Sequence, residues 1–212
     1  MPSSPSGVRL PQQRRSRESL ERLMQAGEAL LARDGYDGLT VAEVSRRAKV
    51  SVGSVYGRFE SKDALVHAIH LRMLTRMNDQ ATLGDEPDLE ATVRAGVGAL
   101  ATVMHRERAL LRAFMLRGPV DPKIAEPGSR ASRAAAEAFR HRVLRHRDEI
   151  SHRDPEVAAD VAFRTVYDVL ARQVMYGPTF ESARAISWDE LVEELIEVCL
   201  AYLGADREFS RE

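Results

Sequence analysis

Apolar residues recur at intervals of three and four along most of the chain, which is the spacing that predicts amphipathic helices. In the first such run, arginine and glutamate separate the apolar positions. The run ends at Asp34-Gly35, where glycine can adopt the left-handed conformation that terminates helices. The pattern predicts a first helix over about 16–33, with apolar positions Leu20, Leu23, Met24, Gly27, Leu30 and Leu31.

Capping residues mark the next three helices. Thr40 and Glu43 have the spacing of a capping box, in which the Thr40 hydroxyl accepts from the Glu43 backbone and the Glu43 carboxylate reaches back. Ser51 suits the N-cap of a third, short helix, and Ser61 that of a fourth helix over 62–80. Their inward-facing residues are expected to be Val41, Val44, Ala48, Val55, Phe59, Leu65, Ile69, Met73 and Met77.

Further helices are predicted over about 88–105, 107–117, 128–149, 155–176 and 188–203. Asp154-Pro155 and Ser187 provide capped starts for the last two. Three prolines, at positions 119, 122 and 127, predict a stiff connection before the helix at 128. Because no convincing strand alternation or internal repeat accompanies these helices, the predicted fold class is all-α, with about nine helices.

The composition fits a globular protein. Hydrophobic residues make up 44% of the 212 residues and charged residues 30%, which is too apolar for a chain disordered throughout. The single cysteine, Cys199, excludes an intrachain disulfide, and no Cys/His spacing supplies a four-ligand zinc site. Residues 1–13 lack the apolar stretch of a signal peptide, and no segment approaches the ~20 apolar residues that span a bilayer. A reducing cytoplasm is expected.

The net charge of −1 conceals an asymmetry along the chain. Residues 1–80 hold 13 basic and 9 acidic side chains, a net charge of +4, whereas the remainder carries a net charge of −5. A basic front and an acidic back indicate a module that faces nucleic acid, joined to a module with another task.

Residues 40–59 combine a capped helix, a tight turn around Lys49-Val50-Ser51 and a second capped helix. This is the spacing of a helix-turn-helix, although an ordinary helical hairpin has the same outline. A helix that enters the DNA major groove needs a second helix to brace it and small or polar side chains toward the bases. Ser54, Gly57 and Arg58 meet that demand.

The stretch Val50-Ser-Val-Gly-Ser-Val-Tyr-Gly-Arg-Phe-Glu-Ser-Lys-Asp-Ala-Leu65, preceded by Asp34-Gly-Tyr-Asp-Gly-Leu-Thr40, closely resembles the DNA-binding domain of the TetR family of bacterial transcriptional regulators. The resemblance covers about residues 16–68. The matching positions are Tyr36, Thr40, Ser51, Gly53, Tyr56, Phe59, Ser61, Lys62 and Leu65.

The resemblance implies three parts. A flexible basic arm over 1–15 would precede a three-helix helix-turn-helix DNA-binding domain over 16–62, followed by a larger helical effector-binding and dimerisation domain over 63–212. The implied partners are a double-stranded DNA operator, a second copy of the chain and an unknown small-molecule effector, with no membrane.

Two positions depart from the family pattern. The family often has glycine where this chain has Lys49, and a non-glycine residue in a left-handed turn costs on the order of 1 kcal/mol, although other turn geometries avoid that cost. Gly57 stands where a bulky or aromatic residue is usual. Its small size shifts base reading to Ser54, Arg58 and Val52.

The resemblance assigns DNA contacts in and around this segment. Tyr56 and Thr40 can donate hydroxyls to phosphates, and Lys62 stands at a helix N-terminus that favours anions. Val52 can meet a thymine methyl group, while Gly53 allows close approach. The full set of candidates is Arg14, Arg15, Arg17, Thr40, Ser51, Val52, Gly53, Ser54, Tyr56, Gly57, Arg58 and Lys62.

Several of these assignments have a structural alternative. Tyr56 could be a half-buried packing residue, and Arg58 could be a solvated charge rather than a partner for guanine. Arg14, Arg15 and Arg17 are consistent with a minor-groove tail and equally with solubilising charges.

The last two predicted helices are apolar on more than one side, so each needs more than one neighbour. In the resembled family they pair with their twins in a four-helix dimer interface, which places two reading helices at half-sites about 34–36 Å apart. Packing within one chain is the alternative. The interface candidates are Val161, Val169, Leu191, Leu195, Val198, Cys199 and Tyr202.

The family also carries an effector pocket in this domain, and a mainly apolar pocket is expected here. Methionine and aromatic residues at helical spacing are also typical of plain core. The candidates are Met73, Met77, Val97, Leu100, Met104, Phe114, Met115, Phe139, Phe163, Tyr167 and Tyr176.

Enzyme signatures are missing: there is no G-x-S-x-G, G-x-x-x-x-G-K or H-E-x-x-H motif. His67 and His70 lie one helical turn apart but so near the helix-turn-helix that surface or hinge roles are favoured over metal ligation. His141 and His146 do not share a helix face. No catalytic residue, metal or cofactor is expected.

The sequence therefore predicts a cytoplasmic homodimeric regulator, a repressor released from its operator by a small apolar or amphipathic molecule. The alternative is a helical ligand-binding or scaffold protein whose helix-turn-helix does not read DNA, which Gly57 and Lys49 leave open.

Overall fold

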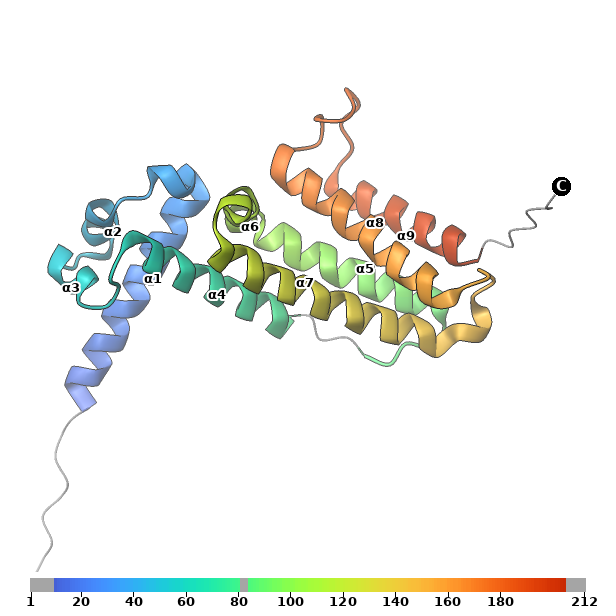
Figure 1. Ribbon diagram of the computed structural model, residues 1–212, viewed down its shortest axis with the longest axis horizontal. Coiled ribbons are helices and arrows are strands. Elements are labelled where there is room, and N and C mark those ends of the chain that lie inside the picture. The colour runs from blue at the N-terminus through green and yellow to red at the C-terminus, as the bar shows by residue number, and fades with distance from the viewer. Residues whose placement is uncertain (1–9, 81–83, 205–212) are drawn as a thin grey trace, which may run out of the picture. The chain divides into compact units, whose positions relative to one another are not determined.

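The computed structural model describes residues 10–80 and 84–204, and within these ranges all regular structure is helical (Figure 1). The predicted all-α fold class is confirmed. The chain divides into two compact units, Met1–Arg72 and Met73–Glu212. Across the described ranges, no helix combines the length and the apolar character needed to cross a membrane.

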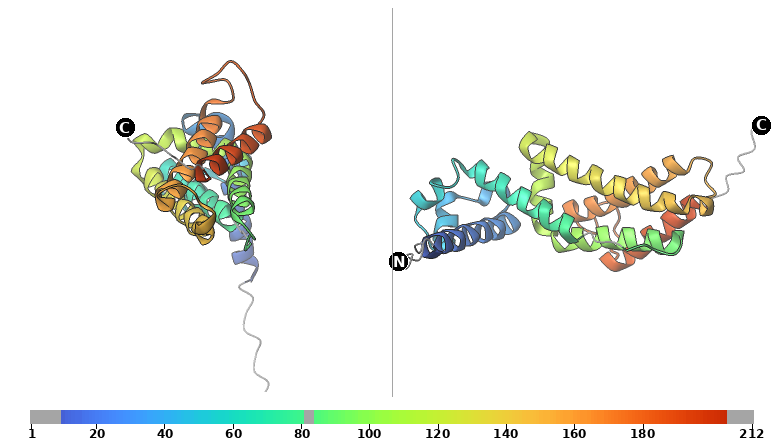
Figure 2. Two further views of the ribbon diagram at one scale, coloured as in Figure 1. Left: turned by 90° about the vertical axis from the view of Figure 1, so that its right-hand side faces the viewer. Right: turned by 90° about the horizontal axis from the view of Figure 1, so that it is seen from below.

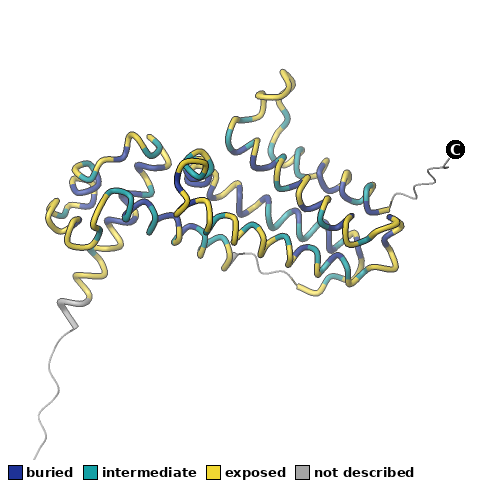
Figure 3. The backbone as a smooth tube through the Cα atoms, viewed as in Figure 1, coloured by how far each residue is buried: buried dark blue, intermediate teal, exposed yellow. Residues whose placement is uncertain are grey.

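The first unit contains α1 (Leu10–Gly38), α2 (Val41–Ala48), α3 (Val52–Tyr56) and the first part of α4 (Lys62–Gln80). Within α1, Gly35 has a left-handed φ of 69°, close to the predicted helix end. Buried residues lie on all four helices and in the link between α1 and α2 (Figure 3). They include Leu23, Leu30, Leu39, Val44, Val55, Leu65 and Ile69.

Two boundaries of this unit differ from the predicted ones. Helix α1 begins at Leu10, so the part of the expected flexible arm that the structure describes is helical; an ion pair between Arg14 and Glu18, 2.8 Å long, supports this first segment. Residues 1–9 of the predicted arm lie outside the described residues. The unit also runs to Arg72 rather than ending at 62, because α4 buries side chains such as Ile69 in its core.

The second unit contains the rest of α4 together with α5 (Leu89–Arg106), α6 (Arg108–Arg117), α7 (Pro122–Val143), α8 (Pro155–Tyr176) and α9 (Trp188–Leu203). Helix α5 packs against α7, α8 and α9, and α8 also packs against α6, α7 and α9 (Figure 2). The side chains of Asp88, Asp154 and Ser187 cap α5, α8 and α9. The capped starts predicted at Asp154 and Ser187 are confirmed.

The predicted helix over 128–149 is wrong at both ends. Asp121 accepts a hydrogen bond from the backbone N–H of Lys123, and α7 starts directly after it with Pro122 in its first turn, where a missing N–H costs little. The helix continues through Pro127, so two of the three prolines belong to α7 and not to a stiff connection. At the other end, residues 144–149 form a 3₁₀ segment.

Candidate nucleic-acid interface

The turn between α2 and α3 is held by its own backbone. Lys49 adopts the left-handed conformation, with φ 55° and ψ 47°. Its N–H donates to the Arg46 carbonyl at 3.3 Å, and the N–H of Val50 donates to the Ser45 carbonyl at 3.1 Å. This pair of bonds is the Schellman motif, a common helix ending that usually has glycine in the left-handed position. The buried Ser45 also donates its hydroxyl to the Val50 carbonyl at 2.7 Å, so the turn is closed by a side chain as well.

A side chain of α1 also bonds to this turn. The guanidinium of Arg22 donates through Nε to the Ala48 carbonyl at 3.0 Å, which gives a partner to a carbonyl at the end of α2. Sequence reasoning missed both Arg22 and Ser45. Arg22 belongs to the polar side of its own helix, and nothing local in the sequence indicates a partner that lies 26 positions away.

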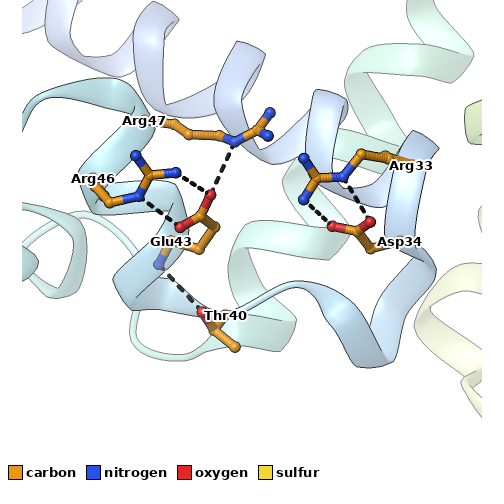
Figure 4. Close-up of polar contacts among 6 residues, drawn as sticks. All are labelled: Arg33, Asp34, Thr40, Glu43, Arg46 and Arg47. Atoms are coloured by element: carbon orange, nitrogen blue, oxygen red, sulfur yellow. Dashed lines mark hydrogen bonds and ion pairs between the residues drawn. The ribbon is translucent and has the colours of Figure 1, made fainter.

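The predicted capping box is half correct. Thr40 accepts a hydrogen bond from the Glu43 N–H at 3.2 Å, as predicted, but the Glu43 carboxylate turns toward two arginines of α2 (Figure 4). Arg46 donates to it at 2.6 and 2.8 Å, and Arg47 donates at 3.1 Å. These bonds, first those from Arg46 and then that from Arg47, lower the pKa of Glu43 to about 2. Charge-assisted bonds to arginine are stronger than the neutral bond to a backbone N–H.

The exposed side chains of residues 51–58 form what we term the reading face. Val55 is buried and anchors α3 to the core, which turns its neighbours outward. Ser51 caps α3 by accepting from the Ser54 N–H at 3.1 Å, and the two hydroxyls lie 2.8 Å apart. Val52 and Tyr56 are 43% and 53% exposed, so the reading face carries two free large side chains. This exposure excludes the half-buried packing role for Tyr56.

Arg58 and Lys62 are both engaged with other side chains of the first unit. Arg58 donates through Nη2 to the Ser16 hydroxyl at 3.2 Å. The Lys62 ammonium lies 4.0 Å from the ring centroid of Tyr36, in a cation–π contact, and the Tyr36 hydroxyl donates to the Asp63 carboxylate. Lys62 is only half-buried, so its ammonium can still approach a phosphate from the start of α4.

The remaining predicted DNA contacts lie on the surface of the same unit. Arg14, Arg15 and Arg17 are exposed on the first turns of α1, and Thr40 is exposed at the start of α2. Gly57 has an ordinary right-handed φ of −68°, so the backbone there does not demand glycine.

The predicted pocket residues belong to the second unit, and all except Tyr176 are buried or half-buried there. Phe163 packs against Phe139 and Tyr167, with ring centroids 5.8 and 6.0 Å apart. Tyr176, in contrast, is exposed at the end of α8 and stacks on Phe180. Met73, Val97, Met104, Phe114, Phe139 and Phe163 are buried, and Met77, Leu100, Met115 and Tyr167 are half-buried.

The aromatic group has a polar end. Burial raises the pKa of the half-buried Tyr167 phenol, and the neighbouring Ser132 of α7 offsets part of this increase.

The predicted dimer residues divide into two sets. Leu195 and Cys199 are buried within the chain itself, and the Cys199 thiol points to the Ala162 carbonyl at 3.9 Å. Burial raises the pKa of that thiol to about 11. Val161 and Val198 are exposed, and so is Val157, which lies one turn before Val161 on α8. Val169, Leu191 and Tyr202 are half-buried.

Comparison with known proteins finds similarity in the helix-turn-helix segment and in the overall fold. Residues 23–69 match the family model of "Bacterial regulatory proteins, tetR family". A transcriptional regulator from Rhodococcus sp. RHA1 is 24% identical, with a TM-score of 0.67 over 88% of this chain and 97% of that chain. A TetR transcription regulator from Haloarcula marismortui is 19% identical, with a TM-score of 0.68 over 89% and 97%. GusR of Salmonella enterica is 21% identical, with a TM-score of 0.63 over 88% and 96%. No curated protein matches the sequence.

Residues 23–69, which match the model of the tetR family of bacterial regulatory proteins, contain the helix-turn-helix of this all-α chain. The similarity to these structures shows that the chain has their all-α fold.

Proposed function

We propose that the chain is a homodimeric, cytoplasmic repressor of transcription that a small apolar or amphipathic molecule releases from its operator. The observation that carries the proposal is the reading face, which α1 and α2 brace while Val52 and Tyr56 stay free. Residues 1–72 hold 12 basic and 8 acidic side chains, whereas residues 73–212 hold 19 and 24, so the favourable charge for a polyanion belongs to the same unit.

In the proposed complex, α3 enters the major groove and groups at its edges hold the phosphates. The Tyr56 phenol, the Thr40 hydroxyl and the Lys62 ammonium are the donors that suit this role. Arg14 and Arg15 would neutralise further phosphates from the first turns of α1.

The arginines can be tested by salt dependence. Each neutralised phosphate contributes about 0.9 to the slope of log affinity against log salt concentration. Arg14→Ala with Arg15→Ala is expected to flatten that slope in fluorescence anisotropy with a labelled duplex. An unchanged slope would remove both arginines from the interface.

Self-association is proposed through the outward side of α8 and α9. Val161 and Val198 are apolar and exposed there, on the helices to which the predicted dimer interface belongs. Val161→Asp with Val198→Asp should give a monomer in light scattering at micromolar concentration, because two charges would be desolvated at each contact. Val120→Asp is the matched control, since Val120 is 69% exposed in the same unit but on neither helix. A monomeric wild type would defeat the dimer.

Release by an effector is proposed through the interior of the second unit, where Phe139, Phe163 and Tyr167 gather beside Ser132. A ligand shifts DNA binding only if it prefers one conformation, since equal affinity for two states changes neither. A thermal-shift screen of lipophilic compounds should find stabilising molecules, and those molecules should also lower DNA affinity. A flat response across chemically diverse sets would contradict this part of the proposal.

One measurement distinguishes the proposed DNA-binding regulator from the alternative, a ligand-binding or scaffold protein. A DNA-reading protein is retained on heparin or generic duplex at low salt, and the retention falls steeply as salt rises. A chain that is not retained at low salt would instead be a ligand-binding or scaffold protein.

A further inference from the structure

The polar side chains of the reading face are already engaged within the chain. The hydroxyls of Ser51 and Ser54 lie 2.8 Å from each other, and the Ser51 hydroxyl also accepts from the Ser54 backbone. The Arg58 guanidinium is bonded to Ser16 of α1. Gly53 and Gly57 present no side chain. Among residues 51–58, the large side chains left exposed without such a bond are therefore Val52 and Tyr56.

Val52 and Tyr56 are four positions apart on α3, which places them on one side of the helix. Tyr56 ends in a hydroxyl that can donate to a phosphate, and this contact would set the depth and register of α3. Val52 ends in two methyl groups, which can neither donate nor accept a hydrogen bond. If Tyr56 holds the backbone, Val52 is the side chain that faces the base edges.

The space beside Val52 favours close approach. A Cβ atom added at Gly53 would meet nothing nearer than the Ser51 hydroxyl, at 3.9 Å. The φ of Gly53 is not left-handed either, so neither packing nor backbone conformation within the chain requires glycine here. A missing side chain next to an exposed valine leaves room for another molecule at that position.

The largest apolar group on the base edges in the major groove is the 5-methyl group of thymine. The hydrogen-bond donors and acceptors there would lose their bonds to water beside a valine, and the valine could not replace them. Resting on the proposed DNA-binding function, we propose that Val52 is a specificity-determining residue that recognises the 5-methyl group of a thymine in each operator half-site.

The experiment starts from duplexes selected by the full-length protein from a randomised library. In the selected duplex, each thymine is replaced in turn by uracil, which removes the 5-methyl group and changes nothing else on the base edge. One thymine per half-site is expected to show weaker binding on replacement, by about fourfold, the value of one buried methyl-sized group. Fluorescence anisotropy at fixed salt concentration measures the change.

The variants assign the effect to a side chain. Val52→Ala is expected to bind the thymine and uracil duplexes equally, because the contact is gone in both. Val120→Ala removes the same two methyl groups from an exposed valine outside the reading face and is expected to retain the wild-type preference for thymine. Circular dichroism confirms that each variant is folded, which the exposure of both positions favours.

Each remaining outcome is decisive. A wild type that is indifferent to uracil at every position, or a Val52→Ala variant that keeps the preference, overturns the inference while DNA binding stands. A wild type that tolerates uracil but binds more tightly when cytosine is replaced by 5-methylcytosine overturns thymine as the source of the methyl group. If no sequence is enriched, the proposed operator recognition fails together with the inference.

Discussion

Lys49 carries backbone strain at the centre of the helix-turn-helix. Across residues 10–80 and 84–204 it is the one non-glycine residue with a positive φ, 55°. A left-handed conformation costs an L-residue about 1–2 kcal/mol, whereas glycine adopts it freely. Glycine also makes the unfolded chain more flexible, which costs about 0.4–1 kcal/mol. Lys49→Gly is therefore expected to raise the free energy of unfolding by about 0.5–1 kcal/mol.

The matched control is Lys49→Ala, which removes the same ammonium and stem but keeps the Cβ atom that causes the strain. Chemical denaturation followed by circular dichroism gives the free energy of unfolding, and the fluorescence of Trp188, the single tryptophan, reports on the second unit alone. The glycine variant should be more stable than the alanine variant. If it is equally stable or less stable, the turn is not strained, and the Schellman bonds account for its conformation without any cost at Lys49.

Three further predictions concern packing, pH and thiol chemistry. A methyl group on Gly96 would lie 2.8 Å from the Phe139 ring, so Gly96→Ala should lower the free energy of unfolding by about 1–3 kcal/mol in denaturant titration. As the control, a methyl group on Gly98 would meet no atom within 4 Å, so Gly98→Ala should raise the free energy of unfolding by up to about 1 kcal/mol, because alanine favours helix more than glycine does. Similar effects of the two substitutions would contradict the close contact between Gly96 and Phe139. Because the pKa of Glu43 is lowered from 4.5 to about 2, its ionised form stabilises α2 above pH 4.5 and this stabilisation is lost as the pH falls toward 2. Glu43→Gln should therefore lower the melting temperature more at pH 6 than at pH 2, and a constant difference across that range would refute the ion pairs. Burial raises the pKa of the Cys199 thiol from 9.0 to about 11, so less of the reactive thiolate is present at pH 8. Cys199 should therefore react with a disulfide reagent at least about 100-fold more slowly in the folded protein than in the unfolded chain. Equal rates would show that the thiol is accessible.

Local sequence determined where most helices begin and end. Helix α4 occupies the predicted range 62–80, and α8 and α9 occupy 155–176 and 188–203. Each of these starts depends on a side chain that bonds to a backbone N–H two or three residues later, and each helix depends on bonds between residues four apart. Such interactions involve neighbours in the chain, so a pattern of residues is enough to predict them.

The errors arose where one residue type has two local uses. Proline at position 122 was expected to interrupt the chain, but with Asp121 as a cap it starts α7 instead. Glu43 was expected to return to the backbone of Thr40, but Arg46 and Arg47 provide stronger, charged partners. In both cases the pattern allowed two partners, and the energies of the competing bonds decided between them.

Periodicity also left open which apolar side of a helix faces inward. The predicted dimer set contained Leu195 and Cys199, which the chain buries for itself, together with Val161 and Val198, which stay outside. All four residues are apolar, and each lies on an apolar stripe of its helix. Only the placement of α8 beside α9 separates the residues that one chain covers from those left exposed.

The sequence by itself determined the all-α class, the helix-turn-helix and the position of the reading face, because periodicity, caps and the turn are encoded within a few residues. The tertiary structure decided how that face is held and which of its groups remain free. Arg22 donates a hydrogen bond to the last residue of α2, and Arg58 donates one to Ser16. Lys62 makes a cation–π contact with Tyr36. The partners in these contacts are 26 to 42 positions apart in the sequence. These contacts depend on how the helices of the first unit pack, and they leave Val52 and Tyr56 as the exposed large side chains of the reading face that are not hydrogen-bonded within it.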